Sequence, residues 1–334
     1  MAFFTTLDAH DVATIARGFD LGQVIRVTAI AGGTISSNFA FDSATRGPGG
    51  DARRTFVRCN EGKPPEVVAW ESALVAELAA AGVPTPAPLT TLEGGHVLHH
   101  RGLAIGAFPW RDGRHLAPAE VEPHHAAALG RALAELHRAG LALPADRQRA
   151  GIYQFADLVR RFEGFRDRPD PALADAVATL ADELAWLATR APVRAAATRG
   201  LIHGDLFRDN VLWDGPRLVA VLDFEQAAAG SLVYDLAVVL NDWCWVPGQG
   251  GVMGPAPALA AAVLAGYQQV RSLAAPEVAA LPVEVRAAAA RFTITRITDV
   301  YLRQLDTPDK DFRAFLARLV AWRGPALGDL LSSV

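Results

Sequence analysis

The chain has 334 residues, of which 51% are hydrophobic and 20% are charged, close to the averages of globular proteins. This composition excludes a largely disordered or collagen-like chain, and the length predicts about two domains or lobes. The 32 Lys and Arg residues against 36 Asp and Glu residues give a formal charge of −4. The chain therefore lacks the basic excess that binding to a nucleic-acid backbone requires, and nucleic acid is not an expected partner.

Cysteine usage and hydropathy indicate the compartment. Cys59 and Cys244 lie far apart with no CxxC spacing, so neither a disulfide framework nor a cysteine zinc site is indicated. The N-terminus lacks the basic and apolar regions of a signal peptide. The long uncharged stretch from Trp243 to Val270 is interrupted by prolines and glycines, which argues against a membrane span. We expect a cytoplasmic protein without membrane segments.

The first part of the chain has strand patterns. Residues 24–30 alternate and are β-branched, and alternation resumes at 38–43 after a glycine-rich turn. A third strand is predicted at 55–59, and two prolines then begin a helix that Gly82 ends. Short strands follow up to Phe108. Residues 1–108 therefore read as a small sheet-rich lobe with one long helix.

Helical patterns dominate residues 109–334, which we expect to form a second, larger lobe. Helices are predicted at 118–139, 153–166, 170–190, 256–274, 280–304 and 308–322. One β-rich block, residues 200–224, interrupts them with short apolar strands around a polar loop. The predicted fold class is α+β.

Three oxygen-bearing residues lie beside the strands of this block. In phosphoryl transfer, a loop Asp accepts the acceptor hydroxyl's proton, an Asn five residues later binds Mg²⁺, and an Asp after the next strands bridges the metal to the phosphates. These roles fall on Asp205, Asn210 and Asp223. One Asp and one Asn are a suitable protein share for Mg²⁺, which keeps water and phosphate ligands.

The surrounding motifs resemble a known family. The run HGDLFRDNVLW from His203, VLDFE from Val221 and YDLA from Tyr234 resemble the aminoglycoside phosphotransferase and choline kinase superfamily. The NDWC stretch from Asn241, the early SSNF and the late KDFR are similar to its type II homoserine kinase group. The resemblance implies a protein-kinase-like two-lobed fold, ATP and Mg²⁺ as cofactors, and transfer of the γ-phosphoryl group to a small-molecule hydroxyl.

A glycine-rich turn follows the first strand, where glycines allow close approach of phosphates and hydroxyls can donate to them. The expected nucleotide-binding residues of this turn are Gly32, Gly33, Ser36, Ser37 and Asn38. The sequence lacks GxxxxGK[ST], which argues against a P-loop kinase.

A helix carboxylate gives a second nucleotide-site prediction. Glu71 lies on the apolar face of the first long helix, and an inward carboxylate needs a partner. Protein kinases pair such a Glu with a third-strand Lys that holds phosphates, whereas the third strand here offers Arg58. We expect an Arg58–Glu71 pair, with Lys63 as the next candidate for the cation.

Two further sets of residues have predicted roles around the loop and the adenine. The stretch IGAFPW resembles the segment that holds adenine through backbone groups, so Ala107 and Phe108 are expected there. His203, just before Asp205, is expected to brace the loop by hydrogen bonding. Asp235, near a predicted helix start, is expected to do the same.

The acceptor site is the least defined part. For homoserine it needs a cation for the carboxylate, an anion or carbonyls for the ammonium, and the hydroxyl near Asp205. The candidate residues are Asp242, Trp243 and Arg296, with Arg291 and Arg303 on the same late helix. Choline would instead need an aromatic cage, for which Trp243 and Trp245 are available. An aminoglycoside would need an acidic cleft. A nucleotide-binding protein without catalysis is the alternative outside this class, suggested by Arg58 in place of Lys. The sequence does not indicate the oligomeric state.

Overall fold

The computed structural model describes residues 5–30, 36–44, 53–144, 147–305 and 307–331. The chain divides into two compact units. The first contains residues 1–113 together with Val219–Glu225, and the second contains Arg114–Leu218 and Gln226–Val334. The sequence-based division between residues 108 and 109 places Val219–Glu225 in the second lobe, whereas the structure groups this segment with the first unit.

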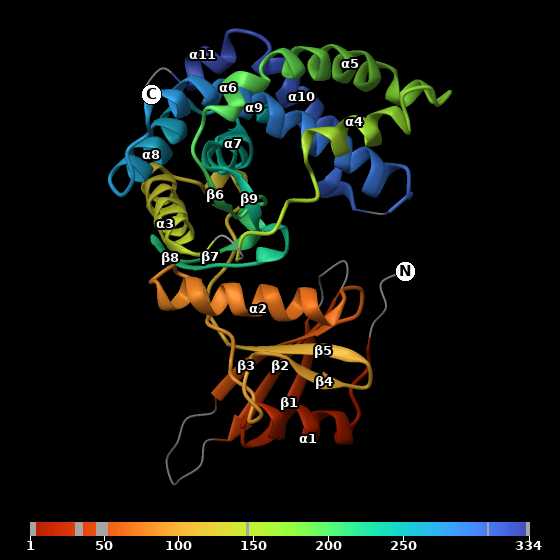
Figure 1. The fold of residues 1–334 in the computed structure, drawn as a ribbon, viewed down its shortest axis with the longest axis vertical. Helices are drawn as coiled ribbons and strands as arrows, with labels where there is room; N and C mark the ends of the chain where they lie inside the picture. Colours follow the sequence, from red (N-terminus) through yellow and green to blue (C-terminus); the bar gives the residue numbers. More distant parts are fainter. Residues whose placement is uncertain (1–4, 31–35, 45–52, 145–146, 306, 332–334) are drawn as a thin grey trace. The chain divides into compact units, whose positions relative to one another are not determined.

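The first unit is built on an antiparallel five-stranded sheet of order β1-β2-β3-β5-β4. Helices α1 (Ala9–Gly18) and α2 (Pro65–Ala80) lie on opposite faces of this sheet (Figure 1). The strands are β1 (Gln23–Ile30), β2 (Ser36–Ala44), β3 (Arg53–Asn60), β4 (Leu98–His100) and β5 (Leu103–Pro109). The predicted sheet with one long helix is confirmed.

Side-chain alternation places the core of this unit. Phe41, Val57 and Ile105 come from three neighbouring strands and are fully buried, and they pack with Ile15 of α1. The register sets Arg58 of β3 opposite Asn38 of β2. Because the apolar residues of β2 and β3 face the core, Arg58 and Asn38 project from the other face of the sheet.

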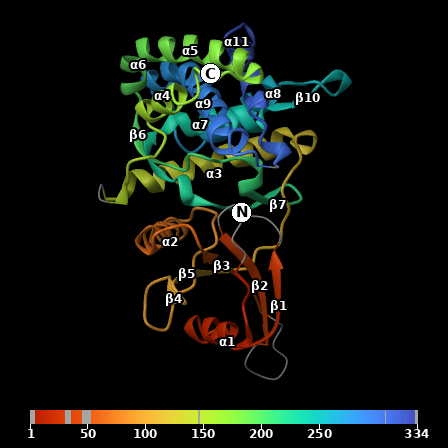
Figure 2. The same ribbon diagram turned by 90° about the vertical axis from the view of Figure 1, so that its right-hand side faces the viewer.

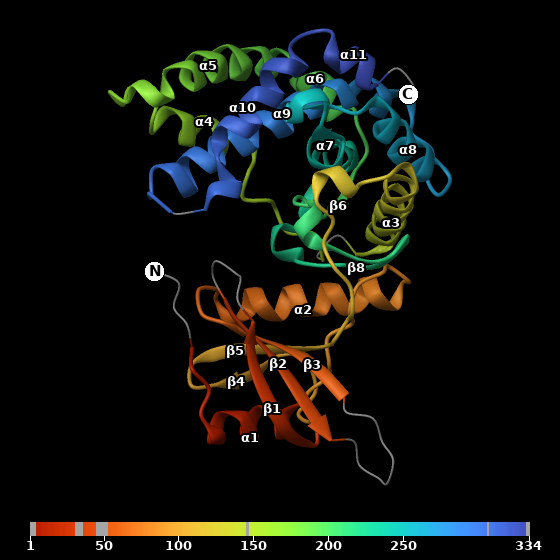
Figure 3. The ribbon, with the colours of Figure 1, turned by 180° about the vertical axis from the view of Figure 1, so that it is seen from behind.

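The second unit is mainly helical, as predicted. Helix α7 (Leu232–Trp243) runs through its centre, and every one of its residues except Tyr234 is buried (Figure 3). The other helices are α3 (Pro123–Ala142), α4 (Phe155–Glu163), α5 (Ala174–Thr189), α6 (Ala191–Ala195), α8 (Pro257–Gln268), α9 (Ala275–Arg296), α10 (Phe312–Trp322) and α11 (Ala326–Leu330). Together these elements confirm the α+β class.

Short strands accompany these helices. β6 (Arg199–Ile202) pairs antiparallel with β9 (Ala228–Ser231), and β10 (Trp245–Pro247) pairs with β11 (Met253–Pro255) in a projecting hairpin (Figure 2). The remaining strands are β7 (Val211–Asp214) and β8 (Arg217–Val221), and the last three residues of β8 belong to the first unit. The predicted β-rich block at 200–224 is confirmed, whereas β9 and the β10–β11 hairpin were not predicted. No helix in the described part of the chain has the length and apolar character needed to cross a bilayer.

Several predicted helices differ at both ends, and α9 differs most. α9 begins at Ala275 instead of residue 280 and ends at Arg296, after which a π-helical turn spans Ile297–Tyr301. Pro276 lies in the first turn of α9, where a missing N–H costs nothing. The helix also continues through Pro282. The predicted span already contained Pro282, whereas the earlier start of the helix with Pro276 in its first turn was not predicted.

Two glycines allow α3 and α8 to pack backbone against backbone. A Cβ on Gly130 would lie 2.1 Å from the carbonyl oxygen of Val263, and a Cβ on Gly266 would lie 2.1 Å from that of Ala127. Both contacts are with main-chain atoms, which cannot rotate away. The close approach of the two helices therefore requires glycine at both positions.

Gly130→Ala is expected to lower the free energy of unfolding by about 1–3 kcal/mol, because the new methyl forces α3 away from α8. Gly328→Ala in α11 is the matched control, since a Cβ there meets no neighbour. The measurement is urea unfolding followed by circular dichroism. Equal midpoints for Gly130→Ala and the control would contradict the close contact.

Candidate active site

The loop between β6 and β7 is held at its start by Asp235 of α7. Both oxygens of this buried carboxylate accept backbone N–H groups, from His203 at 2.6 Å and from Gly204 at 2.7 Å. The His203 side chain is buried as well, and its Nδ1 accepts the N–H of Asp205 at 3.3 Å. Asp235 and His203 therefore lie in the arrangement expected for residues that fix the loop.

A second carboxylate of α7 holds the other end of the loop. Asp242 accepts the backbone N–H of Arg208 at 2.9 Å and its Nη2 at 3.0 Å, and its carbonyl accepts Nη1. Trp243 donates its indole N–H to the carbonyl of Leu206 at 3.1 Å. Helix α7 thus contacts the loop at its start, middle and end.

These contacts show how two of the predicted acceptor residues are used within the protein. Both carboxylate oxygens of Asp242 are used by Arg208, and the Trp243 side chain is fully buried. Trp245 is also buried, so the aromatic cage considered for a quaternary ammonium is not formed by this pair. An acceptor contact at Asp242 or Trp243 stays a prediction.

Asp205 and Asn210 lie on the loop that α7 holds. The carbonyl of Asp205 accepts the side-chain amide of Asn210 at 2.8 Å and the N–H of Phe207 at 2.8 Å. The Asp205 carboxylate is 30% exposed, and its Oδ1 lies 3.4 Å from Nη1 of Arg291. The hydrogen bond from Asn210 Nδ2 to the Asp205 carbonyl orients the side-chain amide, and its oxygen is the atom that would bind a metal.

Arg296 does not make the corresponding contact. Its Nη1 donates to the carbonyl of Asp311 at 3.1 Å, and its guanidinium lies over the ring of Phe315 at 4.4 Å. Burial lowers the pKa of the Arg296 guanidinium, although Asp242 and Asp205 act in the opposite direction. The arginine that touches Asp205 is Arg291, one and a half turns earlier on α9.

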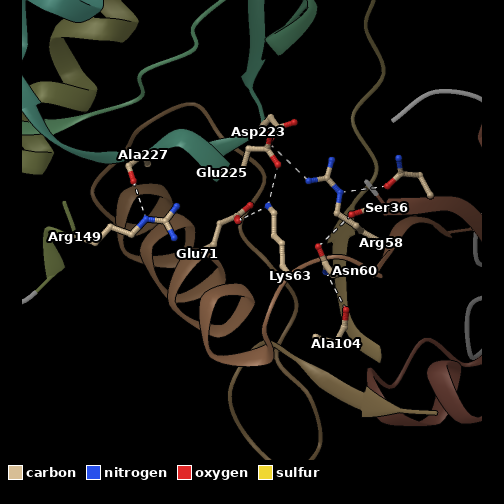
Figure 4. Close-up of polar contacts among 11 residues, drawn as sticks. Ser36, Arg58, Asn60, Lys63, Glu71, Ala104, Arg149, Asp223, Glu225 and Ala227 are labelled. Atoms are coloured by element: carbon tan, nitrogen blue, oxygen red, sulfur yellow. Dashed lines mark hydrogen bonds and ion pairs between the residues drawn. The ribbon is translucent and has the colours of Figure 1, made fainter. Parts of the chain in front are cut away.

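In the first unit, Glu71 is paired with Lys63 and not with Arg58. Lys63 Nζ lies 2.9 Å from Glu71 Oε2 and 3.0 Å from Glu225 Oε2 (Figure 4). Burial acts to lower the pKa of the Lys63 ammonium, but the two carboxylates raise it above its ordinary value. The predicted Arg58–Glu71 pair is wrong because Lys63 lies just before α2, where its side chain can reach Glu71.

Arg58 instead contacts Asn38 and Asp223. Its Nε donates to Asn38 Oδ1 at 3.2 Å, and its Nη1 lies 4.0 Å from Asp223 Oδ1 (Figure 4). Asp223 Oδ1 is buried without a hydrogen-bond partner among the described residues. Asp223 also has a φ of 61°, which is unusual for a residue other than glycine. A buried carboxylate oxygen without a donor fits a cation ligand, the role that the metal prediction assigns to it.

The predicted phosphate loop is described only in part. Ser36 Oγ lies 3.4 Å from Asn60 Oδ1, and Ser37 Oγ donates to Glu61 Oε1 at 2.6 Å. Gly32 and Gly33 lie outside the residues that the structure describes.

The predicted adenine segment belongs to β5. Ala107 is fully buried and its carbonyl already accepts the N–H of Leu89 at 2.8 Å. Phe108 pairs with Phe56 of β3 in the sheet, and their rings lie 6.2 Å apart. Nucleotide binding at these two residues stays a prediction.

Three residues of the candidate site were not among the main sequence-based predictions, because their positions in the sequence gave little indication of their contacts. Lys63 is one of two lysines in the chain, and it was considered only after Arg58 because it lies beyond the third strand. Glu225 belongs to the VLDFE motif but was given no role. Arg208 lies inside the HGDLFRDN run and nothing in its spacing identified Asp242 as its partner.

Known proteins resemble the chain along most of its length. The model of the phosphotransferase enzyme family (APH) matches residues 26–282. The homoserine kinase of Beijerinckia indica subsp. indica is 34% identical over 305 residues, which cover 90% of this chain and 88% of that protein. The homoserine kinase of Acidiphilium cryptum is 33% identical over 310 residues, covering 92% and 91%.

Solved structures share the fold. An amicoumacin kinase in complex with AMP-PNP, Ca²⁺ and Ami superposes with a TM-score of 0.69 at 16% identity, covering 96% of this chain and 93% of that one. A spectinomycin phosphotransferase in complex with ADP and spectinomycin has a TM-score of 0.67 at 14% identity, covering 98% and 99%.

A double-mutant cycle tests the pairing of Glu71. Lys63→Met combined with Glu71→Gln is expected to show an interaction energy of about 0.5–3 kcal/mol, because Lys63 and Glu71 contact each other directly. Arg58→Met combined with Glu71→Gln is the control and is expected to be additive within about 0.5 kcal/mol. The measurement is urea unfolding of the singles and doubles. Coupling of Glu71 to Arg58 but not to Lys63 would contradict the observed pair.

Proposed function

We propose that this chain, which belongs to the phosphotransferase enzyme family, transfers the γ-phosphoryl group of ATP to the hydroxyl of L-homoserine. The observation that carries the chemistry is the loop held by α7, which presents Asp205 and Asn210 from fixed backbone positions. The acceptor is supported by identities of 33–34% with homoserine kinases over about nine tenths of the chain.

Asp205 is the proposed catalytic base. The acceptor hydroxyl donates its proton to the carboxylate while its oxygen forms a bond to the γ-phosphorus. The bond from that phosphorus to the β,γ-bridging oxygen breaks, and ADP leaves with the electron pair. Positioning supplies much of the rate in such reactions, and the two carboxylates of α7 supply the positioning by holding the loop that carries Asp205.

The first unit supplies the proposed nucleotide contacts. Lys63, oriented by Glu71 and Glu225, would bind phosphate oxygens, with Arg58 as a second cation. Ser36, Ser37 and Asn38, together with Gly32 and Gly33, would form the loop over the phosphates, and Ala107 and Phe108 the adenine contact.

Mg²⁺ is the proposed metal. Asn210 and Asp223 would hold it, a donor set of amide and carboxylate oxygen that suits a hard cation. When bound, the ion neutralises charge on the phosphate oxygens.

We propose the cytoplasm as the compartment. Cys59 and Cys244 are both buried free thiols, which suits a reducing environment.

Asp205→Asn is expected to lower kcat by on the order of 10²–10⁴, because the amide cannot take the proton from the hydroxyl. The measurement is homoserine-dependent ADP release with ATP and Mg²⁺, beside calorimetric binding of ADP, which should stay unchanged. Asp214→Asn, an exposed aspartate at the end of β7, is the control.

Substantial turnover in Asp205→Asn would refute Asp205 as the base. A panel of serine, choline, ethanolamine, simple sugars and kanamycin tests the acceptor. Stimulation by another compound in place of homoserine would keep the phosphoryl transfer and overturn the substrate.

A further inference from the structure

A cavity of about 280 Å³ lies inside the second unit, next to the loop that carries Asp205. Its wall includes Gly204 of that loop and residues of β6, β9, α6, α7 and α9. The segment Gly151–Phe155 forms another side. Two hydrogen bonds hold the chain just before this segment against β9 and the residue that precedes it. Arg149 Nε donates to the carbonyl of Ala227 at 3.1 Å (Figure 4), and the Arg149 carbonyl accepts the N–H of Ala229 at 2.7 Å.

The charged side chains of the cavity wall are predominantly positive. They are Arg194, Arg199, Arg291 and Glu284. Glu284 is neutralised by Arg194, whose Nε and Nη2 donate to its two oxygens at 3.1 and 2.9 Å. Arg291 is paired with Asp205 of the adjoining loop at 3.4 Å, and Arg199 is exposed. The charged groups at the cavity thus keep a small positive excess, which favours an anionic group over a polycation.

Arg291 is the buried member of this set. Only 4% of its surface is exposed, and its guanidinium carbon lies 3.8 Å from the ring centroid of Phe292 and 4.2 Å from that of Tyr153. These rings stabilise the charge through their faces and use none of its N–H groups. The hydrogen bonds of Arg291 therefore remain for groups in the guanidinium plane.

One in-plane donor is used and another is not. Nη1 lies 3.4 Å from Asp205 Oδ1. Nε is buried and has no hydrogen-bond partner within the described part of the chain, although leaving a buried donor of a charged group unpaired is energetically unfavourable. Nε and the adjacent Nη2 form the edge of the guanidinium that binds a carboxylate through two parallel hydrogen bonds. Arg291 thus lines the cavity beside Asp205 with a donor edge that a carboxylate would complete.

We infer that this cavity binds the carboxylate of an amino-acid acceptor through Arg291, which makes Arg291 a specificity-determining residue. The inference rests on the proposed function and defines its substrate class as small alcohols that carry a carboxylate. One guanidinium then contacts the carboxylate through its Nε edge and Asp205 through Nη1, so the acceptor hydroxyl is brought toward the base. Arg296, whose contacts are Asp311 and Phe315, does not take this role.

The test compares two ligands that differ only in the carboxylate. 3-Aminopropan-1-ol is L-homoserine without that group, and the dissociation constants of both are measured by titration calorimetry in the presence of ADP and Mg²⁺. The wild-type chain is expected to prefer homoserine by about 100-fold, as a paired charge-assisted contact provides. Arg291→Met is expected to bind both ligands with similar affinity.

Because each preference is a ratio within one protein, partial unfolding of a variant does not change it. A loss that acts only through Asp205 would affect both ligands equally. Arg286→Met is the matched control: Arg286 lies on the same helix and is paired with Glu183 outside the cavity wall, so it should keep the wild-type preference. A wild-type preference retained by Arg291→Met would overturn the inference, as would a wild-type chain that does not distinguish the two ligands.

Arg291→Lys provides the second variant should the Met variant not fold. It keeps a positive charge beside Tyr153, Phe292 and Asp205 but lacks the paired donors of the guanidinium. Its preference for homoserine is expected to fall about tenfold, and an unchanged preference would contradict the inference. Failure of the proposed function is seen separately: a wild-type chain that binds homoserine through Arg291 but does not phosphorylate it would refute the activity and keep the carboxylate site.

Discussion

The buried carboxylate of Asp235 is the constraint on which the candidate site depends. A charge inside a protein is tolerated only when donors surround it, and the donors here are two consecutive backbone N–H groups of the loop and the ring of His137 at 3.1 Å. In the observed conformation the loop supplies both of these backbone donors at once. Asp242 lies seven residues later, two turns along the same face of α7, and sets the other end of the loop through Arg208.

The helices around α7 extend this network. Since a carboxylate only accepts, His137 donates to Asp235 through Nε2, and its Nδ1 is then left to accept the hydroxyl of Tyr267 at 2.8 Å. Tyr267 follows Gly266, one of the two glycines that let α3 and α8 approach each other. A packing contact between two outer helices is therefore connected by hydrogen bonds to the backbone of the loop that presents Asp205.

Local patterns in the sequence predicted much of the fold and part of the site. The sheet-rich first part, the helical remainder and the strand–loop–strand block around Asp205 follow from alternation, periodicity and turn residues. The placement of Asp205 and Asn210 on one short loop could also be predicted, because it depends only on residues close together in the sequence. The longer helices were predicted in the right order, but their ends differ by up to eight residues, most of all at α9, where the first-turn proline was not recognised.

What the sequence could not give was the direction of individual side chains in three dimensions. Strand membership favoured Arg58 over Lys63 as the partner of Glu71, but Arg58 lies opposite Asn38 in the register, and Lys63 lies where the chain enters α2. Asp242 and Trp243 were expected at the acceptor, and their role as buried supports of the loop was not foreseen. Arg291 and Arg296 are indistinguishable by composition, and only the tertiary packing brings the first to Asp205.

The division of the chain has a consequence for its synthesis on the ribosome. Val219–Glu225 belongs to the first unit, where the N–H of Val221 donates to the carbonyl of Pro84 at 2.6 Å and Glu225 completes the carboxylate pair around Lys63. At about 5–20 residues per second, this segment is translated several seconds after residue 113. Until Glu225 has been translated, Lys63 lacks one of its two carboxylate partners. The folding of the first unit can therefore be completed only after much of the second unit has been made.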